Sequence, residues 1–113
     1  MIGLRRKITI VKGNDKDFTV KVTKNGNPIN LTDIEIYCEV KDKPNGQLLF
    51  TGIVTKTDPE HGIFTVRFPR TATQHLTPNQ LVYFDFRFVF TDGSEKNFPT
   101  PPIVCNVVDR VTD

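Results

Sequence analysis

Residues 82 to 90 read V-Y-F-D-F-R-F-V-F, an alternation of large apolar and mostly polar side chains. Successive side chains of an extended strand point to opposite faces. The alternation therefore gives two sets, Phe84, Phe86, Phe88 and Phe90 on one face and Tyr83, Asp85, Arg87 and Val89 on the other. Burying a Phe side chain contributes roughly 1.5–3 kcal/mol, so the Phe face alone is comparable with the net stability of a small domain, about 5–15 kcal/mol. A shift of one residue would expose every Phe, so the register is strongly specified.

Other segments repeat this period of two and predict further strands. Their inward sets are Phe18, Val20 and Val22; Ile34, Ile36, Cys38 and Val40; and Phe64, Val66 and Phe68. Residues 48 to 55 read as a less regular strand whose facing the pattern does not assign. Gly52 within it marks a bulge or a close approach of another chain segment.

Turn residues separate these strands. Asn25-Gly26 predicts a tight hairpin, because Gly and Asn tolerate positive φ. Pro99, Pro101 and Pro102 are expected to interrupt the chain between a strand at 95–98 and a last strand at 103–108, since proline cannot donate a ladder hydrogen bond. One helical turn is expected between residues 71 and 76. Strands at intervals of about 8–12 residues, with no amphipathic helix, predict an all-β fold, an antiparallel immunoglobulin-like β-sandwich of seven to eight strands.

Composition limits the classes of protein. The chain has 113 residues, which predicts a single domain over 1–113. Its net charge is +2, with both signs interspersed, so no basic stripe for nucleic acid is expected. Arg5, Arg6 and Lys7 follow only a short apolar start, and no apolar run resembles a signal peptide or a membrane span. We therefore expect no membrane partner and synthesis in a cytoplasm.

The two cysteines, Cys38 and Cys105, are open to two interpretations. They can be small apolar side chains in the core, as a reducing cytoplasm favours. They can also form a disulfide between two sheets, as in some immunoglobulin domains. The sequence lacks a CxxC pair and a Cys/His cluster, so a zinc site is not expected.

No residue pattern predicts catalysis or a cofactor. His61 and His75 both lie in polar, turn-like segments without a nucleophile signature. Asp58, Glu60 and His61 form the nearest approach to a metal cluster, but we interpret them as a solvated turn. Paired carboxylates on the third strand would stand roughly 13 Å apart along an extended chain, beyond the range of about 5–9.5 Å that glycoside hydrolysis uses. No catalytic, cofactor-binding or metal-binding residue is assigned.

The outward side chains give a different indication. Aromatic and Arg side chains are over-represented at protein contacts. The candidate partner-binding residues are those that project from strands with an apolar inner face: Tyr37, Arg67, Tyr83, Asp85 and Arg87. Unpaired strand edges offer a second means of binding neighbours.

Four motifs carry a family resemblance: I-T-I-V-K-G-N-D, N-G-N-P-I-N-L-T-D, H-G-I-F-T-V-R-F-P and V-Y-F-D-F-R-F-V-F-T-D-G-S. Together they resemble the small β-sandwich domains of tailed bacteriophages. They are similar in particular to the N-terminal domain of siphophage upper baseplate proteins and to related short tail or head-tail proteins. The chain departs from this pattern in its longer turn at 42–46 and its triple proline.

The resemblance implies a non-enzymatic virion structural or assembly protein of the tail or baseplate. Its partners would be other phage structural proteins, and it would form a homo-oligomer in the assembly. It would be located in the virion tail region, and in the host cytoplasm during assembly. The resemblance brings no catalytic or cofactor residues.

An alternative function is a carbohydrate- or ligand-binding β-sandwich module. Outward Tyr37 and Tyr83 with Arg87 motivate it. The absence of Trp argues against it, because sugar-binding platforms usually use that residue. A small hydrolase has no motivating group of residues.

Overall fold

The computed structural model describes residues 8–109, and within strand β9 it leaves the side chains of 99–101 undescribed. The basic residues Arg5, Arg6 and Lys7 therefore lie outside the described part. The strands are β1 (Ile8–Val11), β2 (Lys16–Lys21), β3 (Thr23–Lys24), β4 (Asn27–Pro28), β5 (Glu35–Lys41), β6 (Leu48–Asp58), β7 (Ile63–Phe68), β8 (Leu81–Val89) and β9 (Glu95–Val108). The helical segments are the 3₁₀ turn η1 (Pro59–His61) and the single α-helical turn α1 (Arg70–Thr73). The predicted helical turn is confirmed, as is the hairpin at Asn25-Gly26, which joins β3 to β4.

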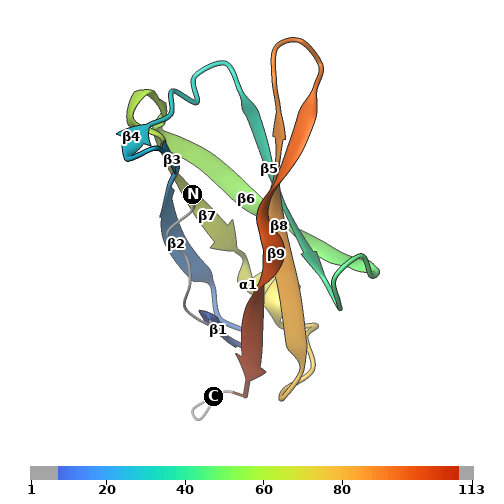
Figure 1. The fold of residues 1–113 in the computed structure, drawn as a ribbon. Coiled ribbons are helices and arrows are strands. Elements are labelled where there is room, and N and C mark those ends of the chain that lie inside the picture. The colour runs from blue at the N-terminus through green and yellow to red at the C-terminus, as the bar shows by residue number, and fades with distance from the viewer. Residues whose placement is uncertain (1–7, 110–113) are drawn as a thin grey trace.

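One long sheet folds over to make two layers (Figure 1). The strand order is β1-β9-β8-β5-β6-β7-β2. The first part of β6 pairs with β5 up to Gly52, and its second part pairs with β7 from Ile53. Strand β6 thus belongs to both layers and closes one side of the sandwich. All pairs are antiparallel among the described strands except β1 with β9, which is parallel. The sequence did not predict this exception, because no hairpin joins the first and last strands to fix their relative direction.

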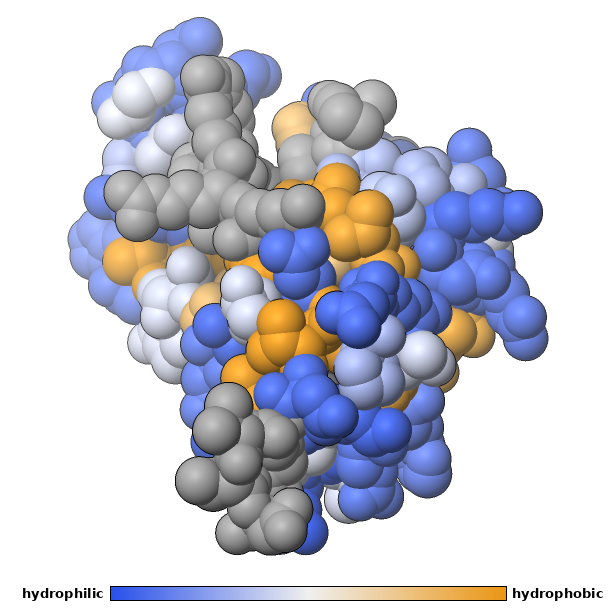
Figure 2. Space-filling view, turned by 90° about the horizontal axis from the view of Figure 1, so that it is seen from below, coloured by the Kyte–Doolittle hydropathy of each residue, from blue (hydrophilic) through white to orange (hydrophobic). Residues whose placement is uncertain are grey.

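The Phe face of β8 lies between the layers. Phe84, Phe86 and Phe88 are buried, and Phe90, just beyond the strand end, is half-buried. The rings of Phe64 and Phe86 meet edge to face with centroids 5.2 Å apart, a favoured aromatic geometry. Viewed from below, apolar residues appear as patches in the middle of the molecule, with hydrophilic residues around and between them (Figure 2). The predicted facing of β8 is confirmed.

The structure also assigns the facing of β6. Phe50 and Val54 are half-buried against the core, while Ile53 is 53% exposed. A Cβ atom on Gly52 would lie 3.0 Å from Val66 and 3.1 Å from Phe68. Of the two interpretations of Gly52, close approach is correct, and the irregularity in the β5–β6 pairing falls at Val40/Lys41 instead.

The expected interruption of the chain at the prolines is wrong, as strand β9 shows. It runs without a break from Glu95 to Val108. Its register with β8 shifts between Phe84, which pairs with Ile103, and Phe86, which pairs with Phe98. Pro99, Pro101 and Pro102 lie between these two pairs, in the stretch where the register shifts. The turn expected around Asp58, Glu60 and His61 begins only after Asp58, because β6 continues to that residue.

Candidate protein interface

Four of the five predicted partner-binding residues gather on one surface. Tyr37 on β5 lies directly opposite Arg87 on β8, and the neighbouring pairs are Glu39 with Asp85 and Lys41 with Tyr83. Strand β9 adds residues in register with Arg87 and Val89. We call this surface the outer face, made of Glu35, Tyr37, Glu39, Lys41, Tyr83, Asp85, Arg87, Glu95 and Asn97.

Tyr37 and Arg87 form the centre of the outer face. The Arg87 guanidinium lies 4.4 Å from the centroid of the Tyr37 ring, a cation–π arrangement. The Tyr37 hydroxyl donates a hydrogen bond to Glu35 Oε2 at 2.7 Å. This bond and the charge of Glu35 raise the pKa of Tyr37. The contacts with Glu35 and Arg87 hold the Tyr37 ring in one orientation. Tyr37 is also 41% exposed, so it is still open to a partner.

Carboxylates fix the other side of the Arg87 guanidinium. Its Nη1 donates to Glu95 Oε1 at 2.7 Å, and its Nε lies 3.9 Å from Glu39 Oε1. The bond to Glu95 raises the pKa of Arg87. Exposed ion pairs of this kind contribute little to folding stability. Their effect here is to orient the guanidinium over the Tyr37 ring.

The outer face carries more carboxylates than cations. Asp85 lies opposite Glu39 in the sheet, an arrangement of like charges that is unfavourable across strands. Asn97 Nδ2 donates a hydrogen bond to Asp85 Oδ2 at 3.3 Å, and the carboxylate of Glu39 lies near the guanidinium of Arg87. Tyr83 lies half-buried beside this pair. A partner with basic groups would complement this surface.

Arg67 is not part of the outer face. It lies on β7 in the second layer, where its Nε and Nη2 donate to the two oxygens of Asp17 at 2.7 and 2.9 Å. The hydrogen bond from Arg67 lowers the pKa of Asp17. Exposed Ile53 on β6 pairs with Arg67 and lies between the two surfaces. The structure therefore divides the predicted set of residues between two layers.

The sequence reasoning missed three partners of the predicted residues. Glu95 and Asn97 reach the outer face from β9, and Asp17 reaches Arg67 from β2. The turn at 91–94 was a usable signal for the first two. A hairpin closing there pairs the start of β9 with the end of β8 and places alternate residues beside Arg87.

Among the described residues, the cysteine thiols and the His61 ring lie apart from the outer face. Cys38 and Cys105 are buried free thiols, as the first interpretation predicted. Burial raises the pKa of both, that of Cys105 to about 12. His61 Nδ1 lies 3.0 Å from Asp58 Oδ1 on an exposed turn, and this partner raises the pKa of His61. Within residues 8–109, no group of His, Cys, Asp and Glu side chains could hold a metal ion.

A family model for the BppU N-terminal domain matches residues 5–112. The chain belongs to this family. The BppU N-terminal domain is the N-terminal domain of a phage baseplate upper protein, a non-enzymatic structural domain. This BppU domain is therefore a structural component of a phage baseplate, in the tail of the virion, where it assembles with other phage structural proteins.

Solved structures give the fold of this BppU domain an independent comparison. CopC from Methylosinus trichosporium OB3b is similar with a TM-score of 0.54 and 14% identity, over 100% of this chain and 94% of CopC. Murine CRIg is similar with a TM-score of 0.49 and 9% identity, over 97% of each chain. At such identity the likeness to CopC shows a shared fold alone, and the fold is an immunoglobulin-like β-sandwich. No curated protein sequence matches the chain significantly. Among the described residues, no helix has the length and apolar character needed to span a membrane.

Proposed function

We propose that this domain is a baseplate subunit that binds neighbouring virion proteins through its outer face, within a symmetric homo-oligomer. The observation that supports this most directly is the pair of Tyr37 and Arg87. Both residue types are frequent at the energetic centres of protein interfaces. Here they are stacked and tied to carboxylates, so little side-chain freedom remains to be lost on binding.

The surroundings of this pair favour an interface over an ordinary solvated surface. Strand β6, next to β5, projects Leu49 and Ile53, which are 38% and 53% exposed. Apolar side chains beside an aromatic and Arg centre, with polar groups around them, resemble the composition of protein contacts. The excess of carboxylates would select partners that present Lys or Arg.

Strand edges offer a second means of contact within the same function. Strand β2 stands at the end of the sheet and pairs only with β7 in the described part of the chain, so its other edge has no strand partner among those residues. A strand from a neighbour could extend the sheet at this edge. Lys16 and Lys21 on β2 limit indiscriminate pairing, because charged residues on an edge strand oppose aggregation.

The proposal is tested by co-purification with the other baseplate proteins, followed by light scattering on the eluted complexes. The double variant Tyr37→Ala/Arg87→Ala should remain folded and lose most of the complex. The matched control is Lys43→Ala, an exposed residue in the turn between β5 and β6. A double variant that enters complexes as well as the control, or a wild-type chain that stays strictly monomeric and alone, would contradict the proposal.

Carbohydrate binding stays a prediction without a supporting contact. Arg87 covers one side of the Tyr37 ring, so this ring offers only its other side for stacking. A glycan array on the wild-type domain, with Tyr83→Ala as comparison, would test it.

A further inference from the structure

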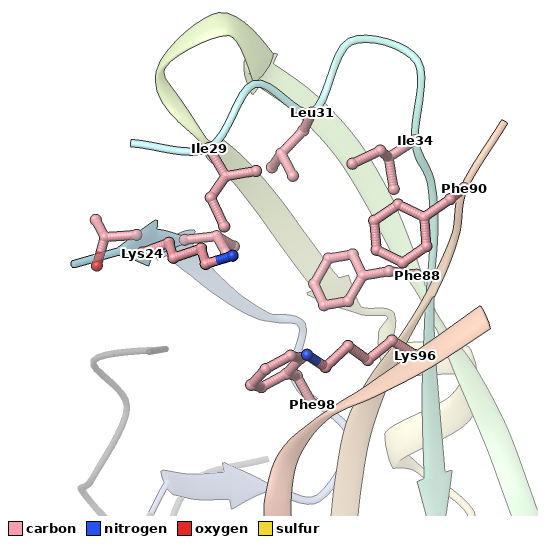
Figure 3. A pocket seen from close by; sticks show the side chains of 10 residues that line it. Lys24, Ile29, Leu31, Ile34, Phe88, Phe90, Lys96 and Phe98 are labelled. Carbon is pink, nitrogen blue, oxygen red and sulfur yellow. The ribbon is translucent and has the colours of Figure 1, made fainter. Parts of the chain in front are cut away.

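A pocket of about 390 Å³ opens between the layers at the end of the molecule away from α1 (Figure 3). This volume falls within the range of pockets that hold ligands, about 300–1,000 Å³. Apolar side chains form most of its lining: Val22, Ile29, Leu31, Ile34, Phe88, Phe90 and Phe98. Val22, Leu31 and Phe88 are buried, whereas the others are only half-buried, so the pocket is an open extension of the core.

Two lysines stand at this pocket. The register of β8 with β9 pairs Phe88 with Lys96 and so places Lys96 on the inner side of the sheet. Its ammonium lies 4.9 Å from the centroid of the Phe98 ring. Lys24 reaches the pocket from the β3–β4 hairpin, and Figure 3 shows both ammonium groups turned toward the space that the apolar side chains surround.

Among the described residues, no carboxylate forms an ion pair with either lysine. The ion pairs of the described residues involve His61, Arg67 and Arg87, and none involves Lys24 or Lys96. The lining of the pocket includes no acidic residue. A pocket with an apolar floor and two ammonium groups that pair with no carboxylate of residues 8–109 is complementary to an apolar group that has a carboxylate next to it.

We propose that this pocket binds an extended segment of a neighbouring virion protein, in which an apolar side chain is flanked by Asp or Glu. The apolar side chain fills the space beside Phe88, and the carboxylate lies between Lys24 and Lys96. The inference rests on the proposed function in one respect, because it assumes that the partner is another protein of the assembly. The pocket is separate from the outer face. It favours an acidic partner, whereas the outer face favours a basic one.

The test is selection of random twelve-residue peptides on the immobilised full-length chain, with affinities of the selected peptides measured by fluorescence anisotropy. Selected peptides should combine an apolar residue with a neighbouring Asp or Glu. Lys24→Glu/Lys96→Glu should weaken their binding roughly tenfold or more, since two charge-assisted contacts are reversed. The matched control, Lys43→Glu/Lys56→Glu, has the same change in net charge at exposed positions that do not line the pocket, and it should bind like wild type.

Peptides without this pattern, or peptides that bind both double variants equally, would overturn the proposal. Sedimentation of the chain alone distinguishes another occupant. A dimer that dissociates in Lys24→Glu/Lys96→Glu but not in the control would place a second copy in the pocket and would also overturn it. Both variants change only exposed lysines, so folding is expected to be retained, and circular dichroism checks this. Peptide binding can succeed while co-purification through the outer face fails, or the reverse, so the two proposals fail separately.

Discussion

The side chains on the two faces of β8 are held in place by different interactions. Its inner face presents Phe84, Phe86 and Phe88 to the opposite layer, and burial alone fixes their position. Its outer face presents Asp85 and Arg87, whose positions depend on partners from β5 and β9. One strand thus carries a face that stabilises the domain and a face that is ordered without being buried. We infer that the first holds the fold together and that the second serves recognition.

The largest expected effect comes from the inner face. Phe86→Ala should lower the free energy of unfolding by about 3–5 kcal/mol, because it removes a fully buried ring and leaves a cavity. Urea titration measures the loss. Phe90→Ala is the matched control and should cost clearly less, since Phe90 is only half-buried beyond the end of the strand. Equal losses would mean that the core is not centred on β8.

A smaller loss of stability is expected when the packing of the second layer against β6 is disturbed. Gly52→Val adds a side chain against Val66 and Phe68 and should cost about 1–3 kcal/mol, the usual range for overpacking. Thr51→Val, one residue earlier on the exposed side, should stay within about 0.5 kcal/mol. A neutral Gly52→Val in thermal or urea unfolding would show that the two layers lie further apart.

The outer face should contribute much less to stability. Arg87→Ala should shift the urea midpoint by a small fraction of the shift in Phe86→Ala, because exposed ion pairs are screened and flexible. The same variant should impair co-purification with baseplate proteins. A loss of stability comparable with Phe86→Ala would erase the distinction between the two faces of β8.

Breaking the exposed pair of His61 and Asp58 should have the smallest effect on stability. It also checks the direction in which Asp58 shifts the pKa of His61. Asp58 raises the pKa of His61 in the folded chain. A raised folded pKa adds stability below the unfolded pKa of about 6.5, and this increment is lost as pH rises through the folded value. Asp58→Asn should lower the pKa of His61, as followed by NMR titration of its ring protons. An unchanged titration would show that the pair does not persist in solution.

The sequence was sufficient for the parts of the fold that burial determines. Alternation predicted the facing of β2, β5, β7 and β8, and Asn25-Gly26 predicted a hairpin, because a strand period and a positive φ are local properties. The parallel pairing of β1 with β9 and the shift that accommodates the prolines were not predictable, since both depend on which distant strands become neighbours.

The candidate site was predictable only in part, for the same reason. Tyr37 and Arg87 were identified as outward residues, but their stacking depends on the register between β5 and β8. Arg67 has the same sequence signal and lies in the other layer. The sequence reasoning missed the pocket because a charged residue such as Lys96 is ordinarily expected to face away from the core. Its parity with Phe98 would nevertheless have placed it on the inner side of β9.

The most direct test of the central claim is photo-crosslinking within assembled particles. A photo-reactive phenylalanine analogue replaces Tyr37, at the centre of the outer face, and in a matched chain it replaces Glu60, an exposed residue on η1. We predict that position 37 crosslinks to another virion protein, identified by mass spectrometry, and that position 60 crosslinks far less. Crosslinks of equal yield from both positions, or none from position 37 in particles that contain the chain, would contradict the account.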